Sequence, residues 1–251
     1  MQLKQSWIDA CDVRVSRRSY RDKEVKTEEI SSILNMISDI NKNAKLNIQF
    51  IEKGKDVLSG FKASYGLISG AKSFIALVGN KNIENYKQNL GYYGEMLVLE
   101  ATSIGLSTCW LGGTYNKNES EKYISIKEDE EIVCIIAVGY ADKELSLKEK
   151  VVKNINKKKK TVDEMLVCHT NDIPYWVQSG AEYAINAPSA VNKKPIVYEF
   201  ADNKVEAIIA KPNHGYEEVD LGISMLHFQL GALKENHSGV WSFENSHHVF
   251  R

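Results

Sequence analysis

The stretch SGAEYAINAPSAVNKKPIVYEF, residues 179–200, decides how the chain is organised. It predicts a helix, a rigid turn and a strand, because two of the chain's four prolines, Pro188 and Pro195, flank the turn. The stretch EEISSILNMISDINKNAKLNIQFIEK, residues 28–53, has the same order of helix, connection and strand. The chain therefore repeats a pattern of elements late in its sequence.

A second pair of segments extends this correspondence. GYYGEMLVLEATSIGL, residues 91–106, carries apolar residues almost all round and predicts a helix in the interior of the fold. GYEEVDLGISMLHFQLGAL, residues 215–233, repeats its pattern, with Gly222 at the place of Gly94. Two helices of the same kind are therefore expected, one in each part of the chain.

The remaining elements of the first part follow from short-range patterns. An amphipathic helix is predicted from Thr27 onward, because apolar residues then recur at helical spacing. Short β-rich apolar runs predict strands at residues 46–53, 73–79 and 131–140, the last two buried on both faces. Residues 143–160 turn to Lys, Glu and Asn, which indicates an exposed connection.

These elements predict two structurally similar halves, residues 1–165 and residues 170–251. The second half is shorter and would bury little surface alone. The halves should therefore pack together as one compact unit.

Bulk composition bounds the class of protein. The 251 residues include 32 basic and 33 acidic ones, and a formal charge of −1 argues against a surface built for nucleic acid or an acidic membrane. The sequence shows no signal peptide and no run of about 18 apolar residues, so we expect a cytoplasmic protein. The four cysteines lie far apart and indicate reduced thiols rather than a disulfide. His247 and His248 have no spaced ligand partner, so no metal site is expected.

One candidate site lies in the basic segment SRRSYR. Arg17, Ser19 and Arg21 alternate there, and an extended backbone would send all three side chains to one side. Two guanidinium groups beside a hydroxyl suit a phosphate monoester. A solvated basic segment is the alternative interpretation.

Two further segments offer polar groups to a ligand. Gly112 and Gly113 follow an apolar run in GLSTCWLGGT, and paired glycines let a backbone present bare N–H groups to a planar ligand. Ser189 and Asn192 lie in the proline-flanked turn, and an amide, which both donates and accepts, suits the edge of a heterocyclic ring. The alternative for the glycine pair is an ordinary end of a helix followed by a loop. The alternative for the proline-flanked turn is a plain loop with Asx-type hydrogen bonds.

Together these segments resemble the nitroreductase family of flavin enzymes. The matching stretches are RRSYR at residues 17–21, PSAVN at 188–192, GLSTCWLGG at 105–113, VGY at 138–140 and KKTVDEM at 159–165. The resemblance covers most of the chain, and GLSTCWLGG is its most specific part.

The sequence departs from the family pattern in an informative way. In the family, the P-S-x-x-N turn follows the first helix, but here that place holds INKNAKLNIQF and the turn occurs in the second half. The second half lacks the arginine segment and has NHSGVWSF where a Gly-Gly loop would lie. Family members bind FMN at a homodimer interface, with the arginines and Gly-Gly loop from one subunit and the turn from the other. The resemblance thus implies a fused pseudo-dimer with one FMN site per chain, for which a monomer is expected.

The resemblance also implies a set of cofactor-binding residues. The arginine segment would contact the FMN phosphate, the ribityl chain or the pyrimidine edge, and a C-terminal lysine, in an ambiguous register within NKKKK, would add a basic contact. The Gly-Gly loop would approach the ring near its N5, and the turn would face the isoalloxazine edge. The residues are Arg17, Arg18, Ser19, Arg21, Leu111, Gly112, Gly113, Lys158, Lys159, Pro188, Ser189 and Asn192. Lys194 stands where the family usually has Gln.

The implied fold is α+β, with mixed, mainly antiparallel sheets covered by helices and two halves related by a pseudo-twofold axis. The implied function is an FMN-dependent NAD(P)H oxidoreductase, in which NADH or NADPH reduces flavin N5 and a nitroaromatic, quinone or flavin acceptor then takes its place. No catalytic side chain is implied, because the chemistry belongs to the cofactor. The alternatives are an FMN-binding storage or sensor protein without turnover, and a cofactor-free interaction protein.

Overall fold

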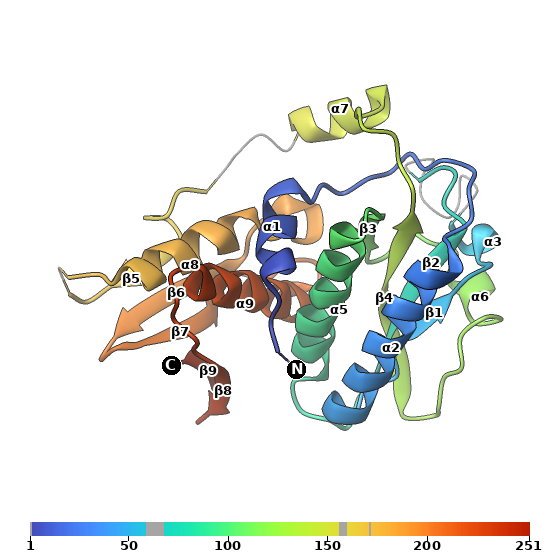
Figure 1. The fold of residues 1–251 in the computed structure, drawn as a ribbon. Coiled ribbons are helices and arrows are strands. Elements are labelled where there is room, and N and C mark those ends of the chain that lie inside the picture. Colours follow the sequence, from blue (N-terminus) through green and yellow to red (C-terminus); the bar gives the residue numbers. More distant parts are fainter. Residues whose placement is uncertain (1, 59–67, 156–159, 171) are drawn as a thin grey trace.

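Two separate β-sheets lie on either side of a group of helices in the computed structural model of the protein (Figure 1). The structure describes residues 2–58, 68–155, 160–170 and 172–251. The predicted α+β class with mainly antiparallel sheets is confirmed.

The first sheet contains four strands in the order β1-β2-β4-β3, all antiparallel. They are β1 (Gln49–Ile51), β2 (Ser73–Asn80), β3 (Ser107–Leu111) and β4 (Glu130–Gly139). Strands β2 and β4 form the buried central pair, as their apolar sequences predict. The strand predicted at residues 46–53 has only three residues, and β3 was missed, because its run STCWL is too short for a clear alternation.

The second sheet contains five strands in the order β5-β6-β7-β9-β8. They are β5 (Leu166–Cys168), β6 (Ile196–Ala201), β7 (Lys204–Ile209), β8 (Trp241–Glu244) and β9 (His247–Phe250). Strand β5 pairs with β6 in parallel, and the other pairs are antiparallel. Without β5, the second sheet has the same strand order as the first: first, second, fourth, third.

The helices largely follow the sequence pattern. They are α1 (Gln5–Val13), α2 (Thr27–Ala44), α3 (Lys55–Leu58), α5 (Tyr86–Ser103), α6 (Lys117–Ser120), α7 (Leu147–Ile155), α8 (Tyr175–Asn186) and α9 (Glu217–Lys234), with a 3-10 turn at Ala190–Asn192. The exposed connection predicted at 143–160 is wrong in part, because it contains α7. A capping box explains this helix: Ser146 and Glu149 bond each other's backbone N–H.

Helices α5 and α9 cross at very short distance through one glycine on each. A Cβ atom added to Gly91 would lie 2.1 Å from the Val219 carbonyl oxygen, and one added to Gly222 would lie 1.9 Å from the Gln88 carbonyl oxygen. Each glycine therefore faces the carbonyl three residues before the other. By position in its helix, Gly222 corresponds to Gly91, the sixth residue of α5, whereas the sequence comparison placed it at the position of Gly94.

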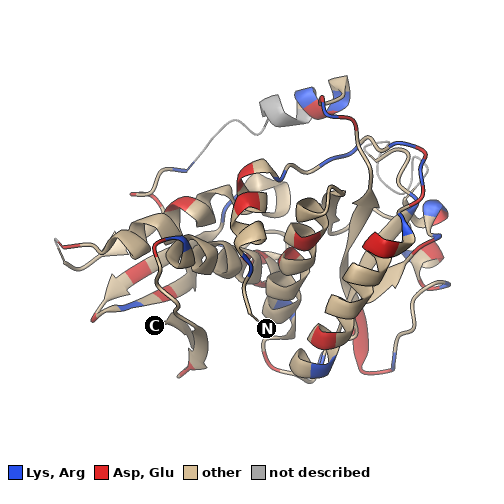
Figure 2. Cartoon of the chain, viewed as in Figure 1, with Lys and Arg blue, Asp and Glu red and all other residues tan. Residues whose placement is uncertain are grey.

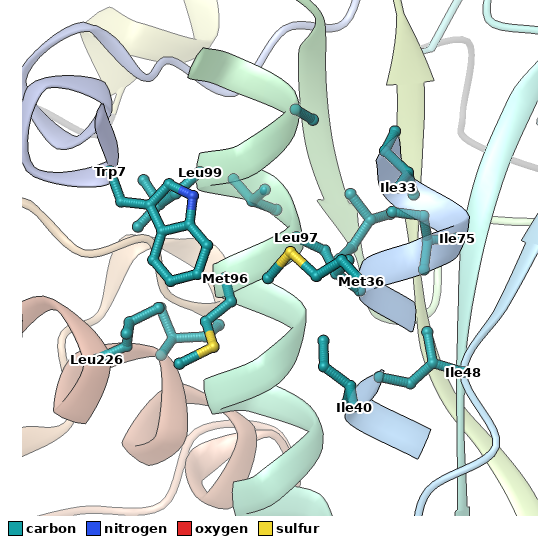
Figure 3. Close-up of a cluster of buried hydrophobic side chains, with 14 of the residues drawn as sticks. Trp7, Ile33, Met36, Ile40, Ile48, Ile75, Met96, Leu97, Leu99 and Leu226 are labelled. Carbon is teal, nitrogen blue, oxygen red and sulfur yellow. The ribbon is translucent and has the colours of Figure 1, made fainter. Parts of the chain in front are cut away.

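The largest buried cluster joins the two parts of the chain around this crossing. Trp7 of α1 lies beside Met96 of α5 and Leu226 of α9, while Met36 of α2 lies on the other side of α5 with Ile75 of β2 (Figure 3). Residues of both parts thus share one apolar core, which fixes the position of every segment that emerges from it.

Charged residues of both signs are spread over all parts of the fold (Figure 2). Within the described ranges, no helix combines the length and the apolar character needed to cross a bilayer.

The crossing predicts an unusual response to substitution. Replacing helical glycine with alanine normally favours a helix by roughly 0.5–1 kcal/mol. Gly222→Ala should instead lower the free energy of unfolding by about 2–3 kcal/mol or more, because its Cβ would meet backbone that no side-chain rotation can clear. Urea denaturation followed by circular dichroism measures the change.

Gly113→Ala is the control, since its nearest neighbour would be the Tyr216 hydroxyl at 3.7 Å. Equal stability of the Gly222 variant and the native protein would show that the two helices do not approach at this point.

Candidate functional site

A cavity of about 620 Å³ lies where segments of the two parts of the chain meet. Its lining residues belong to residues 14–18, 110–114, 185–194 and 214–223, joined by Cys134, Leu145, Glu149 and Lys160. The cavity therefore contains the turn from the second half and the Gly-Gly loop from the first, which are far apart in the sequence.

Helix α1 places the arginine segment at the edge of the cavity. The carboxylate of Glu100, on α5, accepts hydrogen bonds from Trp7 Nε1 at 2.7 Å, Lys4 Nζ at 2.8 Å and Ser32 Oγ at 3.2 Å. This buried group ties α1 and α2 to the central helix.

The segment that follows α1 is extended, as predicted. Its backbone N–H groups bond neighbouring strands and loops: Arg17 to the Thr108 carbonyl, Tyr20 to the Ser69 carbonyl and Arg21 to the Tyr140 carbonyl, each at 2.8–2.9 Å. Side chains then alternate between two sides, and sequence alone does not say which side faces the ligand.

The structure divides the arginine segment into two sets of residues. Arg14, Ser16 and Arg18 line the cavity, together with Val15 at the start of the segment. Arg17, Ser19 and Arg21, which were predicted to contact the cofactor, instead bond residues 142–149. Arg17 bonds Glu149 and the carbonyls of Asp142 and Glu144, Ser19 bonds Ser146, and Arg21 pairs with exposed Asp142. Of the predicted residues in this segment, only Arg18 lines the cavity.

Glu149 lines the cavity next to the arginine segment. It accepts hydrogen bonds from Arg17 Nε at 3.0 Å and from the backbone N–H groups of Arg18 at 2.6 Å and Ser146 at 2.7 Å. Burial opposes the charge of the carboxylate, but these donors outweigh burial and lower the pKa of Glu149 to about 2. Glu149 is thus an ionised group within a cluster of donors at neutral pH.

The Gly-Gly loop also lines the cavity. Gly112 packs against the ring of Tyr216, since a Cβ atom there would lie 2.6 Å from that ring, and Gly113 also borders the cavity. Leu111, a predicted contact, is buried in the core as the last residue of β3 and does not line the cavity.

The proline-flanked turn lines the cavity with Pro188, Ser189 and Asn192. Its backbone is unusual, with positive φ at Val191 and Asn192. Other residues must therefore hold the turn in place.

Asp220, in the first turn of α9, holds this turn. Its carboxylate accepts from the Ala190 N–H at 2.9 Å and from Asn213 Nδ2 at 2.6 Å, and Asn213 also donates to the Ala190 carbonyl. Burial raises the pKa of Asp220 to about 6. Sequence reasoning missed both residues, because nothing local links them to a turn more than twenty residues earlier.

Lys194 lies in the same wall of the cavity. Its Nζ donates to the Ala187 carbonyl, and its backbone N–H donates to Ser189 Oγ at 3.0 Å. Burial, with the nearby charge of Arg14, lowers the pKa of Lys194 to about 8. The cavity thus contains a lysine whose pKa lies well below its ordinary value of 10.5.

The buried carboxylate of Glu95 bonds side chains that line the cavity. Glu95 of α5 accepts from Trp110 Nε1 at 2.7 Å and bonds His227 Nε2 of α9 at 2.9 Å. Arg14 Nε lies 3.7 Å from the same carboxylate and has no hydrogen-bond partner. Burial lowers the pKa of His227, which favours a neutral ring that donates to Glu95. The Arg14 guanidinium is therefore held at the cavity by a fully buried carboxylate.

The lysine run near residue 160 is described only in part. Lys158 and Lys159, the two candidates for the C-terminal basic contact, lie outside the described residues. Lys160 lines the cavity and donates to the Ile196 carbonyl at 3.1 Å, and burial lowers its pKa. At the end of the KKTVDEM stretch, residues 163–165 form a turn.

Residues 7–232 match the model of the family described as "Putative TM nitroreductase". A search of the curated proteins finds no match.

Among solved structures, a "putative nitroreductase" from Thermotoga maritima shares 20% identity and a TM-score of 0.61, covering 100% of this chain and 94% of that one. At that identity the likeness shows a common fold. A "Putative NADH dehydrogenase/NAD(P)H nitroreductase" from Bacteroides thetaiotaomicron shares 21% identity (TM-score 0.49, covering 68% of this chain and 100% of that one). A nitroreductase with bound FMN from Bacteroides fragilis shares 16% (TM-score 0.46, covering 57% and 92%).

The Glu149 cluster predicts a pH-dependent contribution to stability. Because the folded pKa lies below the ordinary value of 4.5, Glu149 stabilises the fold fully above about pH 4.5 and loses this effect as pH falls toward 2. Glu149→Gln should lower the free energy of unfolding by up to about 3 kcal/mol at about pH 6, and by much less at about pH 2.5. Denaturant titrations of both proteins at the two pH values test this. A difference that does not shrink on acidification would show that the donors do not stabilise the charge.

Proposed function

Because the chain belongs to the nitroreductase family, we propose that it is an FMN-dependent NAD(P)H oxidoreductase that reduces a small-molecule acceptor, such as a nitroaromatic, a quinone or a flavin. The observation that carries this proposal is the cavity, in which the Gly-Gly loop and the proline-flanked turn meet beside cationic residues. The names of neighbours with a related fold, one with bound FMN and one called an NADH oxidase, are in keeping with an oxidoreductase.

The cavity suits a flavin in size and chemistry. Its volume of about 620 Å³ falls within the roughly 300–1,000 Å³ of most small-molecule sites. Trp110, Val219 and Ile223 supply apolar surface for a planar ring. Ser189 and Asn192 would face the edge of that ring, and the bare backbone of Gly112 and Gly113 would approach it.

Positive charge is concentrated where a phosphate and a reduced ring would need it. Arg18 and Lys160 both line the cavity and would bind the phosphate group. Arg14, whose buried Nε has no hydrogen-bond partner, would face the ring, where its charge would stabilise the reduced form. This assignment keeps Arg18 from the sequence prediction and adds Arg14 and Lys160.

Bound FMN would supply the chemistry of hydride transfer from NADH or NADPH to the acceptor. The residues of this chain would bind and orient the FMN. Asp220 and Asn213 fix the turn that carries Ser189 and Asn192, and Glu95 fixes Arg14. Lys194, with a pKa of about 8, is placed to donate a proton inside the cavity.

We also propose that the chain is a fused pseudo-dimer with one flavin site and acts as a monomer. Three observations support it: the two sheets share a strand order, α5 and α9 each have 18 residues with glycine at the sixth, and these glycines make reciprocal contacts. A twofold-related pair of subunits makes contacts of this reciprocal kind.

Flavin content and reduction test the proposal. The purified protein should be yellow, with absorbance near about 450 nm and about one FMN per chain, as expected for a tightly held flavin. Stopped-flow mixing with NADH or NADPH should bleach that absorbance. Flavin that neither nucleotide bleaches would support an FMN-binding protein without turnover, and a colourless protein that does not bind added FMN would overturn the proposal.

Two arginines of one segment test which residues hold the phosphate. Arg18→Ala should weaken FMN binding about 10- to 100-fold, the cost of one lost charge-assisted contact, and riboflavin binding much less. Arg21→Ala is the matched control, since Arg21 pairs with exposed Asp142 and does not line the cavity. Fluorescence titrations with both flavins provide the affinities. The reverse pattern would show that Arg21, and not Arg18, binds the phosphate.

A further inference from the structure

The carboxylate of Glu149 lies inside a cluster of donors that would suit an external anion. Besides its bonds to Arg17, Arg18 and Ser146, it lies 3.3 Å from the Ser19 N–H. Its side chain is only 2% exposed. Neighbouring backbone N–H groups that converge on one anion, with a guanidinium beside them, form a typical phosphate-binding arrangement. We call the Arg17 guanidinium and the N–H groups of Arg18 and Ser19 the anion cradle.

The cradle opens toward the cavity, because Glu149 and Arg18 both line it. Arg18, whose backbone N–H bonds Glu149, borders the same cavity with its side chain. An anion that enters at the Glu149 end would thus meet the cradle and the charge of Arg18. A carboxylate supplied by the chain itself already occupies that place.

Helix α7, which carries Glu149, exposes apolar side chains in its described first part. Leu147 and Val151 are 81% and 57% exposed there, so these two side chains pack little against the body of the protein. Figure 1 shows α7 standing apart from the sheets and the central helices. Its described polar contacts to the body gather at its first turn, where Glu149 meets the cradle and Ser146 meets Ser19.

We propose that Glu149 is an internal ligand of the anion cradle, and that the phosphate group of a phosphate-bearing flavin displaces this carboxylate and detaches the first turn of α7. This inference rests on the proposed flavin function and adds to it a competition between two anions for one set of donors.

Charge makes the two occupants mutually exclusive. A phosphate monoester carries about −1.5 to −2 at neutral pH, and a carboxylate within a few ångströms would repel it strongly. The carboxylate is ionised when the phosphate arrives, because the donors hold the pKa of Glu149 at about 2 before any ligand binds. The carboxylate must therefore move out before a phosphate can use the same donors.

Glu149 should therefore reduce the preference of the site for FMN over riboflavin, which lacks the phosphate group. The cost of displacing it falls on FMN, whereas riboflavin has no phosphate and can bind without entering the cradle. The ratio of the two affinities therefore reports on the competition and does not depend on how well the ring itself is held.

Fluorescence titrations of FMN and riboflavin on three proteins test the inference. Glu149→Gln should bind FMN at least about tenfold more tightly than the native protein, with riboflavin affinity changed less than about twofold. Glu144→Gln removes an equal charge from the same segment, where the Glu144 side chain is exposed, and should change neither affinity. Weaker or unchanged FMN binding by Glu149→Gln would overturn the inference, since Glu149 would then position Arg17 for the ligand or have no part in binding.

Hydrogen exchange of the native protein gives a second test that needs no variant. FMN should speed exchange of the backbone amides of residues 147–151, and riboflavin should not. Inorganic phosphate at millimolar concentration should also speed exchange, independently of any flavin. Slower exchange of these amides with either phosphate compound would overturn the inference, because α7 would then close over the anion. If no flavin binds any variant, the flavin proposal fails, while the phosphate experiment still decides whether Glu149 is displaced.

Discussion

The contact between α5 and α9 at Gly91 and Gly222 is the constraint on which the rest of the structure depends. The two backbones approach so closely that neither position has room for a methyl group. This approach brings Glu95 of α5 and His227 of α9 within hydrogen-bonding distance, and it places Asp220 at the turn. Both walls of the cavity are therefore positioned by one pair of helices. A small shift at the crossing would separate them.

Three buried carboxylates connect these helices to the segments that line the cavity. Glu100 ties α1 to the central helix, Glu95 holds Arg14, and Asp220 holds the turn. An unpaired buried carboxylate would be costly, so each of them must find its donors for the fold to be stable. The segments that line the cavity are extended or irregular, and these bonds supply the order that helices and strands supply elsewhere. The proposed flavin chemistry would thus rest on a scaffold whose polar contacts are formed without any ligand.

Local sequence patterns predicted much of this fold. Strands β2 and β4, the start of α2 and the turn at residues 188–192 lie where the patterns placed them, because continuous apolar runs, helical spacing and proline act over a few residues. The boundaries of β1 and α5 were less accurate, and α7 was missed although its S-x-x-E pattern at Ser146 was readable. A lysine-rich composition concealed that signal.

The sequence by itself determined the fold class, the family resemblance and the segments that could form a site, since these depend on patterns within short stretches. Only the tertiary structure decided which side of the arginine segment faces the cavity. Alternation defines two sets of side chains, but the neighbours that select between them, Glu95 for Arg14 and Glu149 for Arg17, lie 81 and 132 residues away along the chain. Contacts over such separations arise from the packing of whole helices, and no local pattern encodes them.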